Sequence, residues 1–111
     1  MWKIDNDLKI TMTRGDTPSF LVDLTDEDGT PYVPMDGDKI IWALKSSAKS
    51  PDLWAFIEIP LDTMILKFRE ETTKALPFGN YVYEISLNND GQNYHDTFIC
   101  NKPLILAEEL Y

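Results

Sequence analysis

The single histidine, His95, and the single cysteine, Cys100, have the most versatile side-chain chemistry in this chain. A Ser-His-Asp site would need His95 beside a serine and a buried acid. Asp96 follows it on a predicted strand, where consecutive side chains point to opposite faces. Cys100 has no partner at C-x-x-C spacing, and one histidine with one cysteine is too small a ligand set for zinc. We therefore expect no enzyme active site and no cofactor, and Cys100 is expected to be a small buried apolar residue.

A run of acidic residues suggests calcium as the next chemistry to consider. These residues are Asp23, Asp26, Glu27, Asp28, Asp36 and Asp38. The EF-hand spacing fails, because a loop with Gly29 at its glycine position would need an acid where Leu24 stands. A calcium site of another kind between loops stays open, but turn formation explains the same residues. We expect no metal site.

The tripeptide Arg14-Gly15-Asp16 matches an adhesion motif, but three letters are easily met by chance. Glycine and aspartate are also frequent turn residues. The tripeptide is expected to form a tight turn that leads into the next strand.

Composition and charge exclude several classes of protein. The chain has 111 residues, a 43% hydrophobic content and a net charge of −9. Such a surface repels phosphate backbones and anionic membranes, so neither nucleic acid nor membrane is an expected partner. The N-terminus lacks the apolar segment of a signal peptide, and no apolar run approaches the length of a membrane span. These features predict a protein made in a cytoplasm.

Short stretches of alternating polarity must position these residues. The longest is Tyr81, Tyr83, Ile85 and Leu87, which alternate with Val82, Glu84, Ser86 and Asn88. Turn signals lie on both sides, at Gly79 and at Asn89-Asp90-Gly91, so this stretch is predicted to be a central strand. Further strands are predicted near residues 8–13, 20–25, 40–45, 54–59, 64–69, 94–100 and 104–106, with a single helical turn within 70–76.

This spacing predicts a single all-β domain over residues 1–111, an antiparallel β-sandwich of about seven strands. The connections are too short for helical crossovers, which favours antiparallel pairing throughout. The predicted core comprises Phe20, Val22, Trp42, Leu44, Met64, Leu66, Tyr81, Tyr83 and Ile85.

The segment Leu76-Pro77-Phe78-Gly79-Asn80-Tyr81 favours an immunoglobulin-like sandwich over a barrel. It resembles the corner before strand F of such domains, where a tyrosine hydroxyl bonds back to upstream backbone. Trp42 would then lie on strand C, near Tyr83. Alternatively, Tyr81 is simply an aromatic residue of the core.

Four segments together resemble a known family. They are residues 14–20, 36–45, 76–85 and 90–98. In order and spacing they are similar to the small immunoglobulin-like domains of tailed bacteriophages and prophages, especially the N-terminal domain of upper baseplate proteins from phages of Gram-positive bacteria. The resemblance implies a non-enzymatic virion structural protein, made in the bacterial cytoplasm and carried in the tail, that binds other tail or baseplate proteins.

Partner contacts are expected at strand edges and exposed aromatic residues, because unpaired strand edges and aromatic side chains favour association. Residues 8–13 and 104–106 are expected to be edge strands, and the core is the alternative place for Trp54 and Phe56. The candidate contact residues are Trp2, Leu8, Ile10, Trp54, Phe56, Leu104 and Leu106. A homo-oligomer, a carbohydrate-binding module that uses Trp54 and Phe56, and an acidic mimic of DNA stay open as alternatives.

Overall fold

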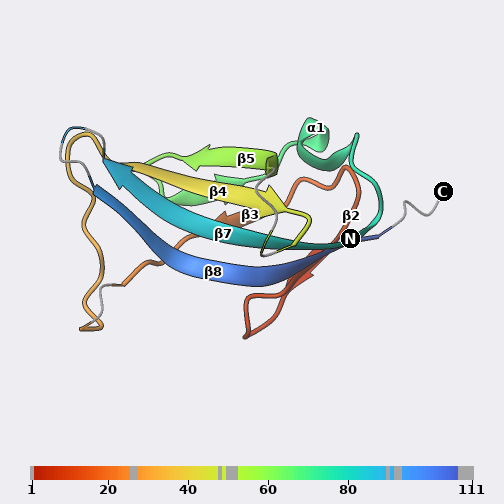
Figure 1. The fold of residues 1–111 in the computed structure, drawn as a ribbon, viewed down its shortest axis with the longest axis horizontal. Coiled ribbons are helices and arrows are strands. Elements are labelled where there is room, and N and C mark those ends of the chain that lie inside the picture. The colour runs from red at the N-terminus through yellow and green to blue at the C-terminus, as the bar shows by residue number, and fades with distance from the viewer. Residues whose placement is uncertain are drawn as a thin grey trace.

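Eight strands and one short helix make up the part of the chain that the computed structural model describes, which is residues 2–25, 28–47, 49, 53–89, 91 and 94–107. Their bounds are β1 Trp2–Ile4, β2 Ile10–Thr13, β3 Ser19–Leu21, β4 Lys39–Lys45, β5 Leu53–Ile59, β6 Ile65–Lys67, α1 Glu70–Thr73, β7 Gly79–Asn89 and β8 Tyr94–Ala107. The all-β prediction is confirmed, as is the single helical turn (Figure 1). No helix within these residues is both long and apolar enough to cross a bilayer.

The strands form a six-stranded sheet in the order β1-β2-β8-β7-β4-β5 and a two-stranded sheet of β3 and β6. Every pair is antiparallel except β2 with β8, which run parallel from Ile10 opposite Leu104 to Thr13 opposite Ala107. The prediction of an entirely antiparallel arrangement is therefore wrong. Short connections constrain only consecutive strands, and β2 and β8 come from opposite ends of the chain.

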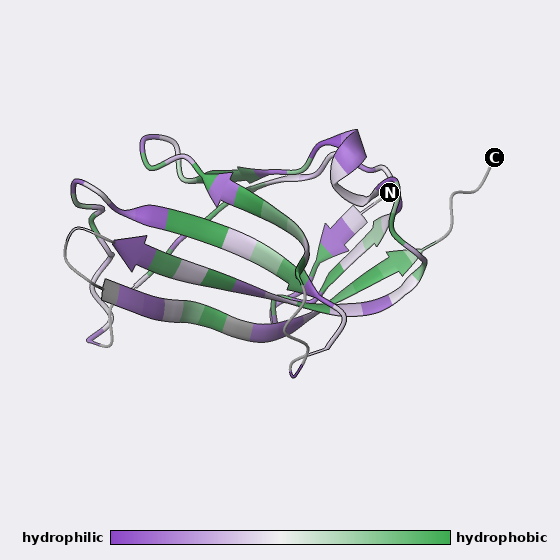
Figure 2. Cartoon of the chain, turned by 45° about the horizontal axis from the view of Figure 1, so that its top comes forward, coloured by the Kyte–Doolittle hydropathy of each residue, from purple (hydrophilic) through white to green (hydrophobic). Residues whose placement is uncertain are grey.

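The central strand of the six-stranded sheet is β7, as its alternation predicts. Tyr81, Tyr83, Ile85 and Leu87 are all buried, while β4 and β8 pair with its two edges. Its last residue, Asn89, lies opposite Tyr94 at the start of β8. Its other neighbour, β4, is apolar through its middle (Figure 2), which is typical of a strand flanked on both sides.

One apolar core lies between the two sheets, so the arrangement is sandwich-like. Trp42 of β4 is fully buried, and its ring centroid lies 4.7 Å from that of Phe68 and 6.0 Å from that of Tyr83. Six of the nine predicted core residues are buried, and the other three, Phe20, Val22 and Met64, are partly buried against the same cluster.

The corner before β7 has the predicted hydrogen bond. The Tyr81 hydroxyl donates to the Pro77 carbonyl at 2.6 Å, and the Tyr81 ring is also buried in the core. Gly79 between them has a φ of 145°, which L side chains rarely adopt. Both interpretations of Tyr81, as a corner residue and as a core aromatic, therefore hold at once.

A buried polar network closes the sheet at the opposite end of β7. The Asp38 carboxylate, 6% exposed, accepts hydrogen bonds from the Met35 N–H, the Tyr32 hydroxyl and the Asn89 amide. Gly37 has a φ of 86°, and a Cβ there would lie 3.2 Å from Asn89 Oδ1. Burial raises the pKa of Asp38, but these hydrogen bonds outweigh it and hold the pKa below its usual value.

Several boundaries differ from the predicted ones. The strand predicted near residues 20–25 is β3, Ser19–Leu21, and beyond it Thr25 forms only an isolated bridge with Pro31. β6 begins after Met64, whose φ of 53° is left-handed. The two predicted C-terminal strands are one strand, β8, because the chain passes through a left-handed residue at Asn101 and stays paired with β7 on both sides of it.

Candidate interaction surface

Large apolar side chains are exposed on β5, an end strand of the six-stranded sheet. Phe56 is 68% exposed, Leu53 53% and Trp54 45%. Phe56 points outward because Ile57 and Ile59 take the inward positions of the alternation, where they contact the core. We call Leu53, Trp54 and Phe56 the β5 edge surface. The structure thus places the candidate contact residues Trp54 and Phe56 on an exposed edge. Leu53 was not among the predicted contact residues, because only the strand order shows that β5 ends the sheet.

Trp54 occupies a β-bulge within this surface. The pairing with β4 passes from Ala55 opposite Leu44 to Lys45 opposite Leu53, so Trp54 is an extra residue. Its ring packs edge-on against Tyr81, with centroids 6.0 Å apart and planes 72° apart. Because the bulge interrupts the alternation, Trp54 and Phe56 no longer share a face by strand period. Trp54 and Phe56 therefore do not form the coplanar pair of aromatic rings on one sheet face that a sugar-binding module would use.

An open depression of about 400 Å³ separates β5 from α1. Glu71 and Thr72 line its helical side, and residues 53–56 line the other. Glu70 and Glu71 make the first turn of α1 acidic. Two basic residues flank the helix: Arg69 at its N-cap and Lys74, whose Nζ lies 3.9 Å from Glu70 Oε1. The charges beside the depression are therefore mixed, and it is the net charge of −9 that favours a partner that is apolar and neutral or basic.

The helix is held in place by the turn that contains Arg14-Gly15-Asp16. The Gly15 N–H donates to Thr73 Oγ1 at 2.9 Å, and Thr73 is fully buried. Asp16 accepts a hydrogen bond from the Thr13 N–H, and the Arg14 guanidinium lies 4.3 Å from the centroid of the Phe78 ring. The turn prediction for this tripeptide is confirmed, and its side chains serve the fold.

The predicted contacts near the two chain ends need correction. β2 lies between β1 and β8, and the end of β8 lies between β2 and β7, so neither segment is an edge. Ile10, Leu104 and Leu106 are at most 1% exposed and belong to the core. The N-terminal residues cause this, because Trp2–Ile4 folds back on β2 as the true edge strand. These three side chains therefore offer no surface to a partner.

The remaining two N-terminal candidates keep some exposure. Trp2 is 41% exposed, and its ring packs edge-on against Phe20 with centroids 5.0 Å apart. Leu8 is partly buried with a left-handed φ of 66°, and its carbonyl accepts a hydrogen bond from the Tyr83 hydroxyl. Burial, with a further effect of the Asp5 charge, raises the pKa of Tyr83 to about 12.

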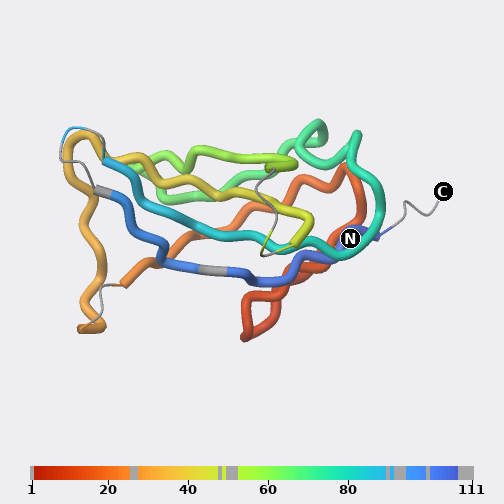
Figure 3. Tube along the Cα trace, viewed as in Figure 1, coloured from red at the N-terminus to blue at the C-terminus, as the bar shows by residue number. Residues whose placement is uncertain are grey.

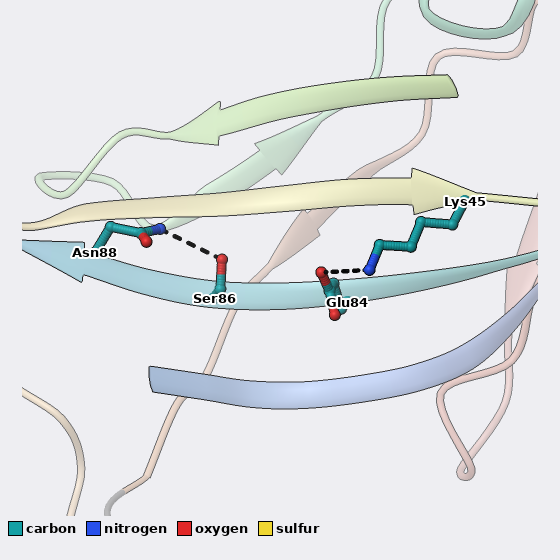
Figure 4. Close-up of polar contacts among 4 residues, drawn as sticks. All are labelled: Lys45, Glu84, Ser86 and Asn88. Carbon is teal, nitrogen blue, oxygen red and sulfur yellow. Dashed lines mark hydrogen bonds and ion pairs between the residues drawn. The ribbon is translucent and has the colours of Figure 1, made fainter. Parts of the chain in front are cut away.

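Polar residues line the outer face of β7 and its neighbours (Figure 4). Lys45 Nζ lies 3.3 Å from Glu84 Oε1, and Asn88 Nδ2 donates to Ser86 Oγ at 3.4 Å. His95 is exposed, with its Nδ1 2.5 Å from Asn88 Oδ1. An amide oxygen is not the buried carboxylate that a catalytic histidine requires. The row is a polar sheet face in which Ser86 is buried and Lys45, Glu84 and Asn88 are partly exposed.

Some residues of the acidic run serve turns, whereas Asp23 lies outside any turn. Asp28 accepts hydrogen bonds from the N–H and hydroxyl of Thr30, which lower its pKa, and Asp38 belongs to the buried network. Within the described ranges no three His, Cys, Asp or Glu side chains converge as metal ligands. Asp26, Glu27 and the side chain of Cys100 lie outside the described residues.

No family model matches this chain, and no curated protein sequence matches it either.

Proposed function

We propose that this chain is a non-enzymatic virion structural protein of a tailed phage or prophage, a tail or baseplate component that acts by binding other tail proteins. The resemblance of its four sequence segments to phage immunoglobulin-like domains motivates the viral assignment. The observation that carries the mode of action is the β5 edge surface, because a strand edge with exposed aromatic side chains is suited to association.

The strand order supports the immunoglobulin-like part of this proposal. In that fold, strands C, F and G lie side by side, variable-type domains add C′ beyond C, and B pairs with E in the other sheet. Here β5-β4-β7-β8 follow the order C′-C-F-G, and β3 pairs with β6 as B would with E. Trp42 lies on the strand that corresponds to C, and the Tyr81 corner opens the one that corresponds to F.

The charge of the chain restricts the partner. With a net charge of −9, two copies repel each other unless their acids lie away from the contact. A neutral or basic tail protein is therefore the preferred partner, and a stable complex should bury on the order of 1,200–2,000 Å².

The test is to mix the purified chain with the products of the neighbouring genes and to measure complexes by sedimentation. Phe56→Ser should weaken binding by about tenfold or more, because central aromatic residues carry most of an interface's energy. Val33→Ser is the matched control, since Val33 is 75% exposed but lies outside the β5 edge surface. A monomer that binds none of these proteins, but binds glycans or a DNA-processing enzyme, would overturn the proposal.

A further inference from the structure

Along much of its length, β8 pairs with a neighbouring strand on only one of its two edges. β2 pairs with β8 only from Leu104 to Ala107, whereas β7 pairs with it along nearly its whole length. From Thr97 to Pro103, none of the strands that the structure describes pairs with the second edge. Figure 3 shows the N-terminal hairpin reaching β8 only towards the C-terminal end of that strand. An edge of this kind presents N–H and C=O groups to an incoming strand.

An apolar groove lies beside this edge, on the open side of the sandwich. Its volume is about 200 Å³, and it runs between the N-terminal hairpin, the residues that follow β3, and the inner faces of β7 and β8. Its lining includes Ile4, Leu8, Leu21, Val22, Tyr83 and Ile99. A cavity of roughly 150 Å³ can hold a benzene ring, so this groove has room for one large apolar side chain.

The groove and the edge are joined at Ile99, which belongs to β8 and lines the groove. Two irregularities interrupt β8 here, a register shift next to Ile99 and the left-handed residue Asn101, so an added strand can keep regular pairing only over a few residues beside Ile99. Over those residues, in line with β2, its side chains would point alternately towards the groove and towards solvent. β2, which pairs in parallel with the end of β8, shows the position that a strand beside this edge takes. Backbone hydrogen bonds and apolar burial would thus be available to the same short segment.

We infer that this groove accepts an extended segment of another protein as an added strand on β8, with large apolar residues alternating with basic ones. Asp23 lines the groove, and Asp5 lies near Tyr83 at its floor. Basic residues also flank the groove: Lys9 lies between two lining residues in the sequence, and Lys102 lies opposite Tyr83 in the β7–β8 register. Asp23 is the one charged side chain among the described lining residues, and together with the net charge of −9 it favours a basic segment over a second copy of this chain. This surface lies apart from the β5 edge surface, and the inference does not depend on a viral origin.

The experiment uses the isotope-labelled full chain and a short synthetic peptide that alternates isoleucine with lysine. Titration followed by NMR should shift the backbone amides of residues 97–102 and slow their exchange with solvent. A peptide that alternates isoleucine with glutamate should bind at least about fivefold more weakly, because several charges are reversed at once. The lysine peptide should bind Asp23→Lys about two- to fivefold more weakly than the parent, given the energy of a single surface charge pair. Asp62→Lys, an exposed acid outside the groove lining, is the matched control and should bind as the parent does.

A copy of the lysine peptide with N-methylated backbone tests the strand pairing and should lose most of its affinity. Equal binding of the methylated peptide, or of the glutamate peptide, would overturn the inference. So would a concentration-dependent dimer that protects the same amides, since the occupant would then be a second copy. Absence of any shift in residues 97–102 also overturns it, whatever the outcome with tail proteins and Phe56→Ser.

Discussion

Replacing Asp38 tests whether the buried polar network holds the end of the sandwich together. Its Oδ2 accepts the Met35 N–H at 2.8 Å and the Tyr32 hydroxyl, and its Oδ1 accepts Asn89 Nδ2 at 2.8 Å. Asp38→Ala removes the acceptor of all three donors in a site that is nearly closed to water. The network joins residues 51 positions apart, so its loss should be felt by the whole fold.

The magnitude follows from the number of bonds and from the charge. A hydrogen bond to a charged group contributes about 1.5–3 kcal/mol, and the desolvation of the carboxylate offsets part of the total. We expect Asp38→Ala to lower the free energy of unfolding by about 3–4 kcal/mol. Asp38→Asn keeps one acceptor oxygen but turns an amide towards a donor, and should cost about 2 kcal/mol. Asp36→Asn is the matched control, because its exposed side chain should change stability by less than about 0.5 kcal/mol.

The same network predicts a pH dependence of stability. The pKa of Asp38 is lower in the folded state than its usual value, so its contribution is fully present above the unfolded pKa. That contribution is lost as the pH falls through the folded pKa. The stability gap between the parent and Asp38→Asn should therefore narrow below about pH 4. Urea unfolding followed by tryptophan fluorescence, from pH 7 downwards, measures the gap. A gap at pH 7 no larger than that of Asp36→Asn, or one that does not change with pH, would refute the reasoning.

Three further predictions concern the core, the corner and metal. Trp42→Ala should lower the free energy of unfolding, measured in urea, by about 3–5 kcal/mol as a large-to-small core change. Trp42→Phe should lower it by only about 1 kcal/mol. The reason is that no described residue accepts a hydrogen bond from the buried Trp42 Nε1, so none is lost. A parent-like midpoint for Trp42→Ala would contradict its place at the centre of the core. Tyr81→Phe should cost about 1 kcal/mol through loss of the bond to the Pro77 carbonyl, and an unchanged stability would show that the corner bond is energetically neutral. Chelator or added calcium should leave the melting temperature unchanged to within about a degree, and a calcium-dependent rise would reveal a bound ion.

The sequence by itself determines the parts of the fold that depend on neighbouring residues. The alternation from Tyr81 to Leu87 predicts a strand with one buried face, and all four of its predicted inward side chains are buried. The turns, the single helical turn and the Tyr81 corner follow in the same way, because glycine conformation, strand period and capping are local properties.

Only the tertiary structure decides which strands lie at the edges. Trp2–Ile4 covers β2, and β2 covers the end of β8, so Ile10 and Leu104 are core residues although their segments were predicted to be edges. The bulge that sets Trp54 apart from Phe56 and the unpaired edge of β8 beside its groove depend equally on pairing between distant strands. Alternation predicts that a strand has one buried face, but it carries no information about which strand pairs with which edge. That choice is made by the packing of residues far apart in the sequence, and it determines which of the apolar side chains a partner can reach.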